Sequence, residues 1–127
     1  MDFYRDIILD HYKNPRHFGK LANPRATASV NNDFCGDQIR MDIDVRDLGK
    51  KSDENKVTDI AFSGIGCAIS TASASMLTEL ACGKKISELK SLKVDDIVAM
   101  LGIELTPTRL KCALLPLEAL HKALQGI

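Results

Sequence analysis

The sequence has no excess of charge of either sign, because 17 lysines and arginines balance 17 aspartates and glutamates over 127 residues. This balance argues against general electrostatic binding to nucleic acid or to an anionic membrane. No apolar run approaches the roughly 18 residues that a membrane helix needs, and the N-terminus lacks the basic start and apolar core of a secretion signal. With 45% hydrophobic and 27% charged residues, the composition predicts a single cytoplasmic globular domain over residues 1–127.

The sequence has no C-x-x-C pair, since its four cysteines are Cys35, Cys67, Cys82 and Cys112. The missing pairs argue against a thiol oxidoreductase and against a knuckle-type structural zinc module. Two disulfides are disfavoured in a reducing cytoplasm, which leaves small buried thiols or a metal site. Cys82 stands at an expected helix end, and we predict a structural or incidental role for it.

Hydrophobic periodicity predicts a helix at the N-terminus, ended by Pro15 after Asn14. Residues 39–46 alternate between apolar and charged side chains, which predicts a strand with one wet face that includes Asp42. Strands near 27–31 and 57–63 are expected to complete a small three-stranded antiparallel sheet, with the polar residues 47–56 joining the last two strands. The strands thus precede most of the helices, which is typical of the α+β class.

Helical spacing returns after Cys67 and predicts a helix that Gly83 ends. Short helices are expected near 86–90 and 94–101. A long C-terminal helix follows, with Thr106 as its cap and Pro107 in its first turn, and Pro116 should bend or interrupt it. The predicted fold is therefore α+β, with an N-terminal helix, a long C-terminal helix and helices packed on one face of the sheet.

This topology brings chemically active side chains together. Cys35 and Asp37 precede the strand at 39–46 and Cys67 follows the strand at 57–63, so an antiparallel pair places them at the same end. Cys112 joins them if the last helix crosses the sheet. Three thiolates and a carboxylate suit tetrahedral Zn²⁺ or the iron of an Fe–S cluster. From the residues alone, isolated thiols remain an equal alternative.

Several motifs resemble one family. The strings GIGCAISTASAS at 64–75, CGD at 35–37, RLKC at 109–112 and HYKNPRHFG at 11–19 are similar to the scaffold family of iron–sulfur cluster assembly, which includes IscU, SufU and the NifU N-terminal domain. The resemblance implies a non-enzymatic carrier that receives sulfur from a cysteine desulfurase, assembles a [2Fe–2S] cluster and transfers it to apo acceptor or carrier proteins.

The resemblance also implies the ligand set Cys35, Asp37, Cys67 and Cys112, for a cluster or for Zn²⁺ at the same site. Sulfur transfer needs a thiolate near positive charge. Cys112, next to Lys111, is therefore the expected first persulfide acceptor, and Cys35 is the alternative.

The sequence departs from the IscU pattern at several points. Lys111 replaces a histidine and resembles SufU, so a zinc-dependent sulfurtransferase that activates a SufS-type desulfurase is the alternative function. The step from Cys67 to Cys112, in contrast, is short as in IscU. Residues 105–109 keep only two of five residues of the IscU chaperone segment, so a dedicated Hsp70-type chaperone is not expected. A homodimer around a shared cluster is a further expectation, and His17 has no assigned role.

Overall fold

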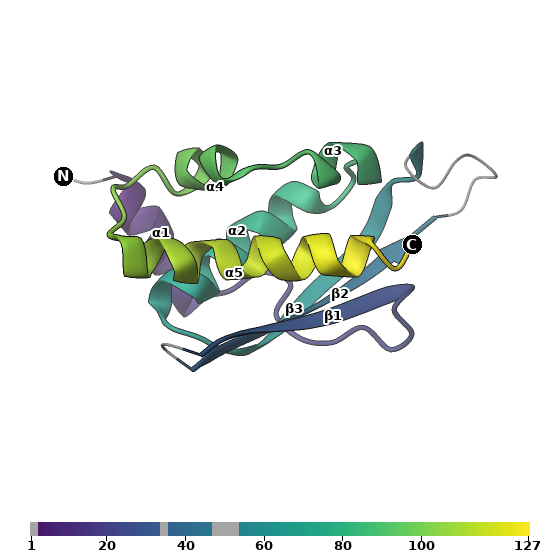
Figure 1. The fold of residues 1–127 in the computed structure, drawn as a ribbon, viewed down its shortest axis with the longest axis horizontal. Helices are drawn as coiled ribbons and strands as arrows, with labels where there is room; N and C mark the ends of the chain where they lie inside the picture. Colours follow the sequence, from purple (N-terminus) through teal and green to yellow (C-terminus); the bar gives the residue numbers. More distant parts are fainter. Residues whose placement is uncertain (1–2, 34–35, 47–53) are drawn as a thin grey trace.

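The computed structural model describes residues 3–33, 36–46 and 54–127. In this part of the chain a helix precedes three strands, and four helices follow them (Figure 1). The elements are α1 (Phe3–Lys13), β1 (Ala26–Asn32), β2 (Asp37–Val45), β3 (Val57–Ile65), α2 (Ala68–Ala81), α3 (Ile86–Lys90), α4 (Val94–Leu101) and α5 (Pro107–Leu124). The order and type of these elements confirm the expected α+β fold.

The three strands form one antiparallel sheet in the order β1-β2-β3. Its register pairs Ala28 with Met41, and Met41 in turn with Phe62. The register shifts between Asp44 and Val45, near the end of β2 that leads to residues 47–53. Those residues, which make up most of the expected hairpin connection, lie outside the described residues. The predicted three-stranded sheet is thus confirmed.

The helices cover one face of the sheet. The long helix α5 packs on β1 and β2, while α2 packs on β3 and is itself covered by α1. The short helices α3 and α4 lie on the side of α2 and α5 that faces away from the sheet (Figure 1). Within the described residues, none of the helices is both long and apolar enough to cross a bilayer.

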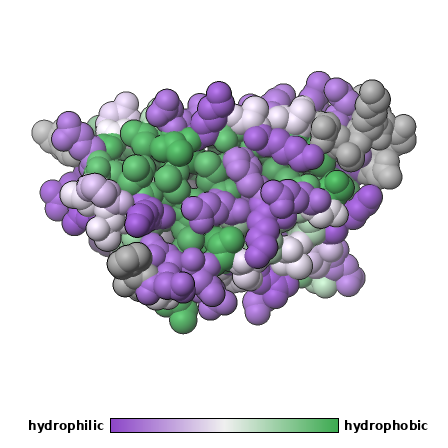
Figure 2. Space-filling model, viewed as in Figure 1, coloured by the Kyte–Doolittle hydropathy of each residue, from purple (hydrophilic) through white to green (hydrophobic). Residues whose placement is uncertain are grey.

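The core lies between the sheet and the α2–α5 layer. Ile39, Met41 and Ile43 of β2 are almost fully buried, and they belong to one cluster with Leu77 of α2 and Leu120 of α5. The alternation that predicted the strand therefore identifies its inner face correctly. Polar groups cover most of the visible surface, but apolar side chains reach it over the region between α4 and α5 (Figure 2).

The outer edge of β3 is covered by chain segments from outside the sheet. Phe62 donates its backbone N–H to the carbonyl of His17 at 2.9 Å, and Gly19 donates to the carbonyl of Phe62 at 2.8 Å. Further along the strand, Gly83 donates to the carbonyl of Val57. These contacts satisfy backbone groups that an open edge would offer to other chains. They also fix the loop after α1 beside the sheet.

Asp42 does not lie on a wet face, and this expectation is wrong. The residue is only 1% exposed because the loop between α1 and β1 passes over it. Its carboxylate accepts hydrogen bonds from Thr27 Oγ1 at 2.6 Å, Arg40 Nε at 2.8 Å and the backbone N–H of Leu21 at 3.2 Å. A buried carboxylate needs such partners, so Asp42 fastens the loop to the outer face of the sheet.

The C-terminal helix is not interrupted at Pro116, which lies buried in the middle of α5. The predicted start is confirmed, since Thr106 is the N-cap, accepts from the backbone N–H of Arg109 and is followed by Pro107 at the first position. Packing on the sheet compensates for the hydrogen bond that Pro116 cannot donate. Ala113, Leu115 and Pro116 all belong to the buried face of the helix.

Candidate metal centre

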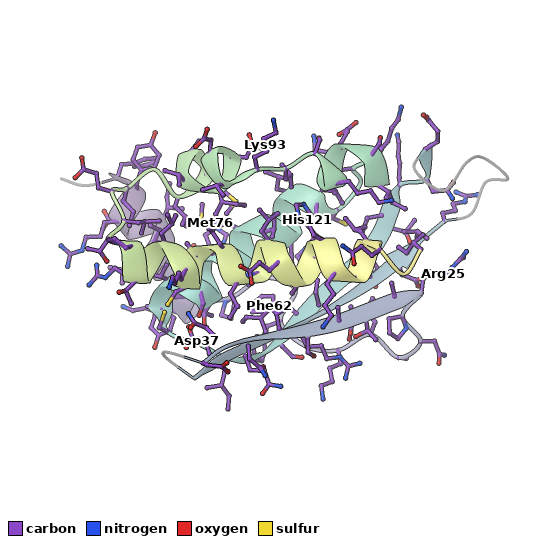
Figure 3. The ribbon with its side chains drawn as sticks, viewed as in Figure 1. Arg25, Asp37, Phe62, Met76, Lys93 and His121 are labelled. Atoms are coloured by element: carbon purple, nitrogen blue, oxygen red, sulfur yellow. The ribbon has the colours of Figure 1, made fainter. Side chains whose placement is uncertain are left out.

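Three of the predicted ligand residues come together at one end of the sheet. One oxygen of Asp37 and the sulfur atoms of Cys67 and Cys112 all lie within 4.8 Å of one another. Each comes from a different element: Asp37 begins β2, Cys67 directly precedes α2, and Cys112 lies in α5. Figure 3 shows Asp37 at this end of the sheet, beneath the N-terminal half of α5. The cluster therefore exists only once these elements have packed.

The strand register accounts for two of the three positions. Gln38 pairs with Ile65 across β2 and β3, so the residue before Gln38 and the second residue after Ile65 lie at the same end of the hairpin. These residues are Asp37 and Cys67. Gly64 allows the strands to approach here, because it has a φ of 131° and a Cβ at this position would overlap the carbonyl oxygen of Gln38. Ordinary residues rarely adopt such a φ.

The third position depends on the packing of α5. Cys112 is only 4% exposed, because α5 packs on β1 and β2. Cys67, in contrast, is exposed and stands at the N-cap of α2. The cluster is therefore open to solvent on the Cys67 side and closed on the Cys112 side.

Asp37 has a buried carboxylate oxygen that no group among the described residues satisfies. The residue is 5% exposed, and no hydrogen-bond partner reaches its Oδ2 from the described residues. A buried carboxylate oxygen without a partner is costly. Its position beside two thiols therefore indicates a role as a ligand for a cation.

The donor set and its spacing fit a tetrahedral metal ion. Zinc with Zn–S bonds of about 2.3 Å places neighbouring sulfur ligands ~3.8 Å apart, and ligand atoms that all lie within 4.8 Å need only a small inward shift to reach this geometry. Two sulfurs and one carboxylate oxygen leave one tetrahedral position for a further ligand. Thiolate-rich sites of this kind suit Zn²⁺ and the iron of Fe–S clusters.

Of the two remaining predicted site residues, the structure describes only Lys111. Cys35 lies outside the described residues. Its expected role as a ligand therefore rests on the sequence alone. Lys111 is exposed and lines a groove of about 310 Å³ together with Asn31, Asn32, Asp33, Leu115 and Glu118. This groove lies between the end of β1 and α5, and Lys111 in its wall directly precedes Cys112.

A second groove, of about 470 Å³, is lined in part by Ala68 and Ile69, which follow Cys67. Its lining comes from α1, from the first turn of α2 and from the segment that enters α5, and includes Leu9, Ile69, Ile103, Glu104 and Arg109. The groove is mainly apolar, with charged groups at its rim. It begins one residue after Cys67, because Ala68 also contributes to its wall.

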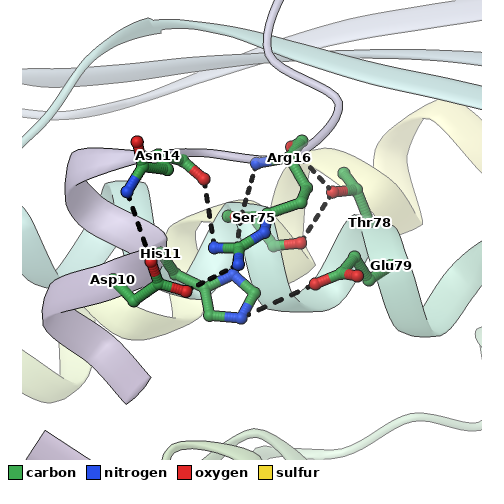
Figure 4. Close-up of polar contacts among 7 residues, drawn as sticks. All are labelled: Asp10, His11, Asn14, Arg16, Ser75, Thr78 and Glu79. Atoms are coloured by element: carbon green, nitrogen blue, oxygen red, sulfur yellow. Dashed lines mark hydrogen bonds and ion pairs between the residues drawn. The ribbon is translucent and has the colours of Figure 1, made fainter. Parts of the chain in front are cut away.

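Cys82 and the histidines do not belong to the described cluster. Cys82 is the C-cap of α2, so the 14 residues of the helix separate it from Cys67 by about 20 Å. His11 is buried, and its Nδ1 lies 2.7 Å from Ser75 Oγ (Figure 4). His121 Nε2 lies 3.0 Å from the carbonyl oxygen of Leu89. Both rings therefore serve packing.

Sequence reasoning missed the residues that support the cluster. In the structure, Ser70 and Ser73 are fully buried and donate hydrogen bonds to backbone carbonyls near the two thiols. Their spacing of three residues, on one side of a helix, was the available signal.

Comparison with known proteins yields one family. The NifU-like N-terminal domain matches residues 3–126. The zinc-dependent sulfurtransferase SufU of Bacillus subtilis is 40% identical, over 94% of this chain and 87% of that protein. The iron–sulfur cluster assembly scaffold protein IscU 1 of Archaeoglobus fulgidus is 36% identical, over 95% of this chain and 74% of that protein.

A solved structure shares the fold. It is the putative iron–sulfur cluster assembly scaffold protein for the SUF system from Fervidobacterium islandicum AW-1, which is 26% identical. It matches with a TM-score of 0.75 over 94% of both chains. The arrangement of sheet and helices described above therefore recurs in that structure.

Proposed function

Because the chain belongs to the NifU-like N-terminal domain family, we propose that it is a scaffold for iron–sulfur cluster biogenesis. It receives sulfur from a cysteine desulfurase, assembles a [2Fe–2S] cluster and transfers the cluster to acceptor proteins. The observation that carries the proposal is the convergence of Asp37, Cys67 and Cys112 within 4.8 Å. The relatives that are named iron–sulfur cluster assembly scaffold protein IscU support it.

The cluster is cargo, and four side chains hold it: Cys35, Asp37, Cys67 and Cys112. Thiolates are soft ligands that suit iron in clusters, whereas a carboxylate is harder and exchanges more readily. The site also opens to solvent at the exposed Cys67. A carrier that must release its cargo benefits from both features. We expect Asp37→Ala to give a longer-lived cluster, and faster loss of the cluster would contradict this role.

Sulfur arrives by persulfide transfer to a cysteine thiolate. The thiolate attacks the outer sulfur of the desulfurase persulfide, the new S–S bond forms as the old one breaks, and the desulfurase leaves as a thiolate. We assign this role to Cys112 because of the neighbouring cation Lys111, with Cys35 as the alternative. The burial of Cys112 requires the site to open during transfer, so the exposed Cys67 belongs in the test.

Persulfide loading distinguishes these acceptors. Cys35→Ser, Cys67→Ser and Cys112→Ser variants are incubated with a cysteine desulfurase and cysteine, and the persulfide on each is measured by mass spectrometry of the intact chain. Loss of loading in Cys112→Ser alone is the expected result. Unchanged loading of that variant, with loss in another, would move the acceptor role to the other cysteine.

A zinc-dependent sulfurtransferase is the second candidate function. It is favoured by the 40% identity to the zinc-dependent sulfurtransferase SufU of Bacillus subtilis and by Lys111 directly before the last cysteine. In this role one Zn²⁺ is held by the same residues, and the chain relays persulfide sulfur and activates its desulfurase. Lys111 itself cannot be a ligand while protonated, which leaves Asp37 as the ligand beside the three thiolates.

One experiment separates the two functions. Protein purified without oxygen is incubated with a cysteine desulfurase, cysteine, ferrous iron and a thiol reductant, which supplies the electrons that convert persulfide sulfur to sulfide. Its iron, acid-labile sulfide and zinc are then counted per chain. About two irons and two sulfides per cluster, with thiolate-to-iron absorption, support the scaffold. A single tightly held zinc, no sulfide and a faster desulfurase support the sulfurtransferase. Each result supports one of the two functions and argues against the other.

The proposed cluster assembly requires partners that supply sulfur and partners that accept the cluster. A cysteine desulfurase and apo acceptor proteins are required, and their place is the cytoplasm, where thiols stay reduced. A homodimer would share one cluster between two chains, so the ratio of iron to protein in the same experiment tests it. The changed segment 105–109 argues against a dedicated Hsp70-type chaperone.

A further inference from the structure

The first two turns of α2 contain two serines whose hydroxyl groups point at backbone near the thiols. Ser70 Oγ donates a 3.1 Å hydrogen bond to the carbonyl oxygen of Cys67, and Ser73 Oγ donates a 2.7 Å hydrogen bond to the carbonyl oxygen of Ala113. Both serines are 0% exposed. Ala113 directly follows Cys112, so each hydroxyl holds backbone at or beside one cysteine of the cluster.

Ser70 holds the backbone of residues 66–67 close to the first turn of α2. A Cβ at position 66 would overlap Ser70 Oγ, so Gly66 leaves the space that this hydroxyl fills. The backbone of residues 66–67 therefore lies close against the first turn of the helix. The carbonyl of Cys67 also accepts from the backbone N–H of Thr71 at 3.0 Å. Two hydrogen bonds thus hold the residue whose sulfur is the exposed member of the cluster.

Ser73 connects α2 to the other cysteine-bearing element. Its bond to Ala113 joins residues 40 positions apart and sets how far α5 lies from α2 at the level of Cys112. Residues three apart lie on the same side of a helix. One rigid turn of α2 therefore holds the Cys67 segment through Ser70 and the Cys112 segment through Ser73.

The stability of the helix does not by itself call for these hydroxyls. Alanine has a higher helix propensity than serine, and a serine that bonds back to a carbonyl of the preceding turn slightly destabilises a helix. The environment is fully buried, where a methyl group is tolerated and a hydroxyl must find a partner. The benefit lies in where the bonded carbonyls are held.

We propose that Ser70 and Ser73 are positioning residues for the metal centre, which set the spacing of Cys67 and Cys112. The inference rests on the proposed function, since it assumes that these thiols bind metal. Neither serine touches the cargo. They act through the backbone, as groups around a metal site do when they orient its ligands.

Cobalt binding to the whole chain tests this role. Co²⁺ is added without oxygen to metal-free wild type, Ser70→Ala and Ser73→Ala, and its affinity is measured by competition with a chromophoric chelator. The visible d–d bands report the coordination geometry, and the thiolate charge-transfer bands report the sulfur ligands. We expect each alanine variant to bind about tenfold more weakly, with altered d–d bands.

Two further variants serve as controls. Ser75→Ala removes another fully buried serine of α2, one that bonds His11 and the backbone N–H of Arg16 away from the cluster, and it should bind Co²⁺ as the wild type does. Ser73→Thr keeps the hydroxyl and should retain the wild-type spectrum. Urea unfolding of the metal-free variants records any general loss of stability.

The outcomes separate the two proposals. If wild type binds Co²⁺ through thiolates and the alanine variants match it in affinity and spectrum, the positioning role is overturned while the proposed function stands. Equal weakening by Ser75→Ala, or by Ser73→Thr, would also overturn it, because stability or side-chain volume would then explain the effect. If wild type shows no thiolate bands, the metal centre itself is wrong and both proposals fall.

Discussion

His11 and Ser75 join the N-terminal helix to the middle of α2, with His11 Nδ1 lying 2.7 Å from Ser75 Oγ. The same hydroxyl accepts the backbone N–H of Arg16 at 2.8 Å, and His11 Nε2 lies 3.6 Å from a carboxylate oxygen of Glu79 (Figure 4). These contacts hold both the end of α1 and the start of the following loop. They connect the covering helix to the element that bears Cys67.

Replacing His11 should change how stability depends on pH. Burial lowers the pKa of His11 below its ordinary value of 6.5, helped by Arg16, while Glu79 and Asp10 act in the opposite direction. The unfolded chain therefore takes up the proton more readily than the folded one. The free energy of unfolding should fall as pH drops through 6.5 towards the folded pKa. Urea unfolding at pH 7.5 and 5.5 should show a smaller loss for His11→Gln than for wild type.

The matched control for that experiment is His17→Gln. His17 lies in the loop after α1, outside the contacts between His11, Ser75 and Glu79. The loss of stability between pH 7.5 and 5.5 should therefore be smaller in His11→Gln than in His17→Gln. An equal pH dependence in wild type and His11→Gln would show that His11 does not carry the effect.

Asp42→Asn should destabilise the fold at neutral pH by about 1–3 kcal/mol, because an amide cannot accept hydrogen bonds from all three donors around Asp42. Burial alone would raise the pKa of this carboxyl, but hydrogen bonds from Thr27, Arg40 and the Leu21 backbone outweigh it and lower the pKa below 3.8. The stabilisation is therefore present above pH 3.8 and is lost as pH falls through the folded pKa. Urea midpoints at pH 7 and pH 3 measure both effects.

Asp44→Asn is the control, because it tests whether the loss of stability depends on the burial of the carboxylate. Asp44 lies on the same strand and the same outward side as Asp42, but it is only half-buried. Its replacement should change the free energy of unfolding by less than about 0.5 kcal/mol. A loss as large as that of Asp42→Asn would contradict the anchoring role assigned to the buried carboxylate.

Zinc should protect one exposed cysteine from alkylation and leave another reactive. Cys67 and Cys82 are both exposed, but only Cys67 belongs to the cluster with Asp37 and Cys112. Iodoacetamide labelling followed by peptide mass spectrometry should modify both in the metal-free chain. After addition of Zn²⁺, labelling of Cys67 should drop at least tenfold while Cys82 labels as before. Equal labelling of Cys67 with and without Zn²⁺ would argue against its role as a ligand.

Gly64→Ala should destabilise the end of the sheet that holds the cluster. Gly64 has a φ of 131°, and an added Cβ would overlap the carbonyl oxygen of Gln38. The cost should exceed about 2 kcal/mol, since backbone strain and a steric clash add. Gly83→Ala is the control, because Gly83 also has a positive φ of 85° but faces open space. Urea unfolding should therefore show a clearly larger loss for Gly64→Ala than for Gly83→Ala.

The sequence predicted the elements well because their signals are local. The alternation of Ile39, Met41 and Ile43 identified β2, and the Thr106–Pro107 pair placed the start of α5 within a residue. The predicted antiparallel pairing also placed Asp37 and Cys67 at one end of the sheet. Each of these inferences needs only the backbone period of an element or the cap of a helix.

Expectations that depended on tertiary packing were less successful. Asp42 follows the strand alternation perfectly, yet it is buried by a loop whose path the alternation does not contain. Pro116 was expected to bend or interrupt its helix, but α5 continues through it because packing on the sheet compensates for the hydrogen bond that it cannot donate. The side chains of Ser70 and Ser73 are ordinary small residues in the sequence, and their hydrogen-bond partners become visible only when α2 lies against α5.

The amino-acid sequence by itself determined which residues offer metal-binding atoms and which elements present them. Only the tertiary structure decided that Asp37, Cys67 and Cys112 meet within 4.8 Å, that Cys67 faces solvent and that Cys112 is buried. The physical reason is that ligand type is a property of each side chain, whereas ligand spacing is set by the packing of β2, α2 and α5, which are far apart along the chain.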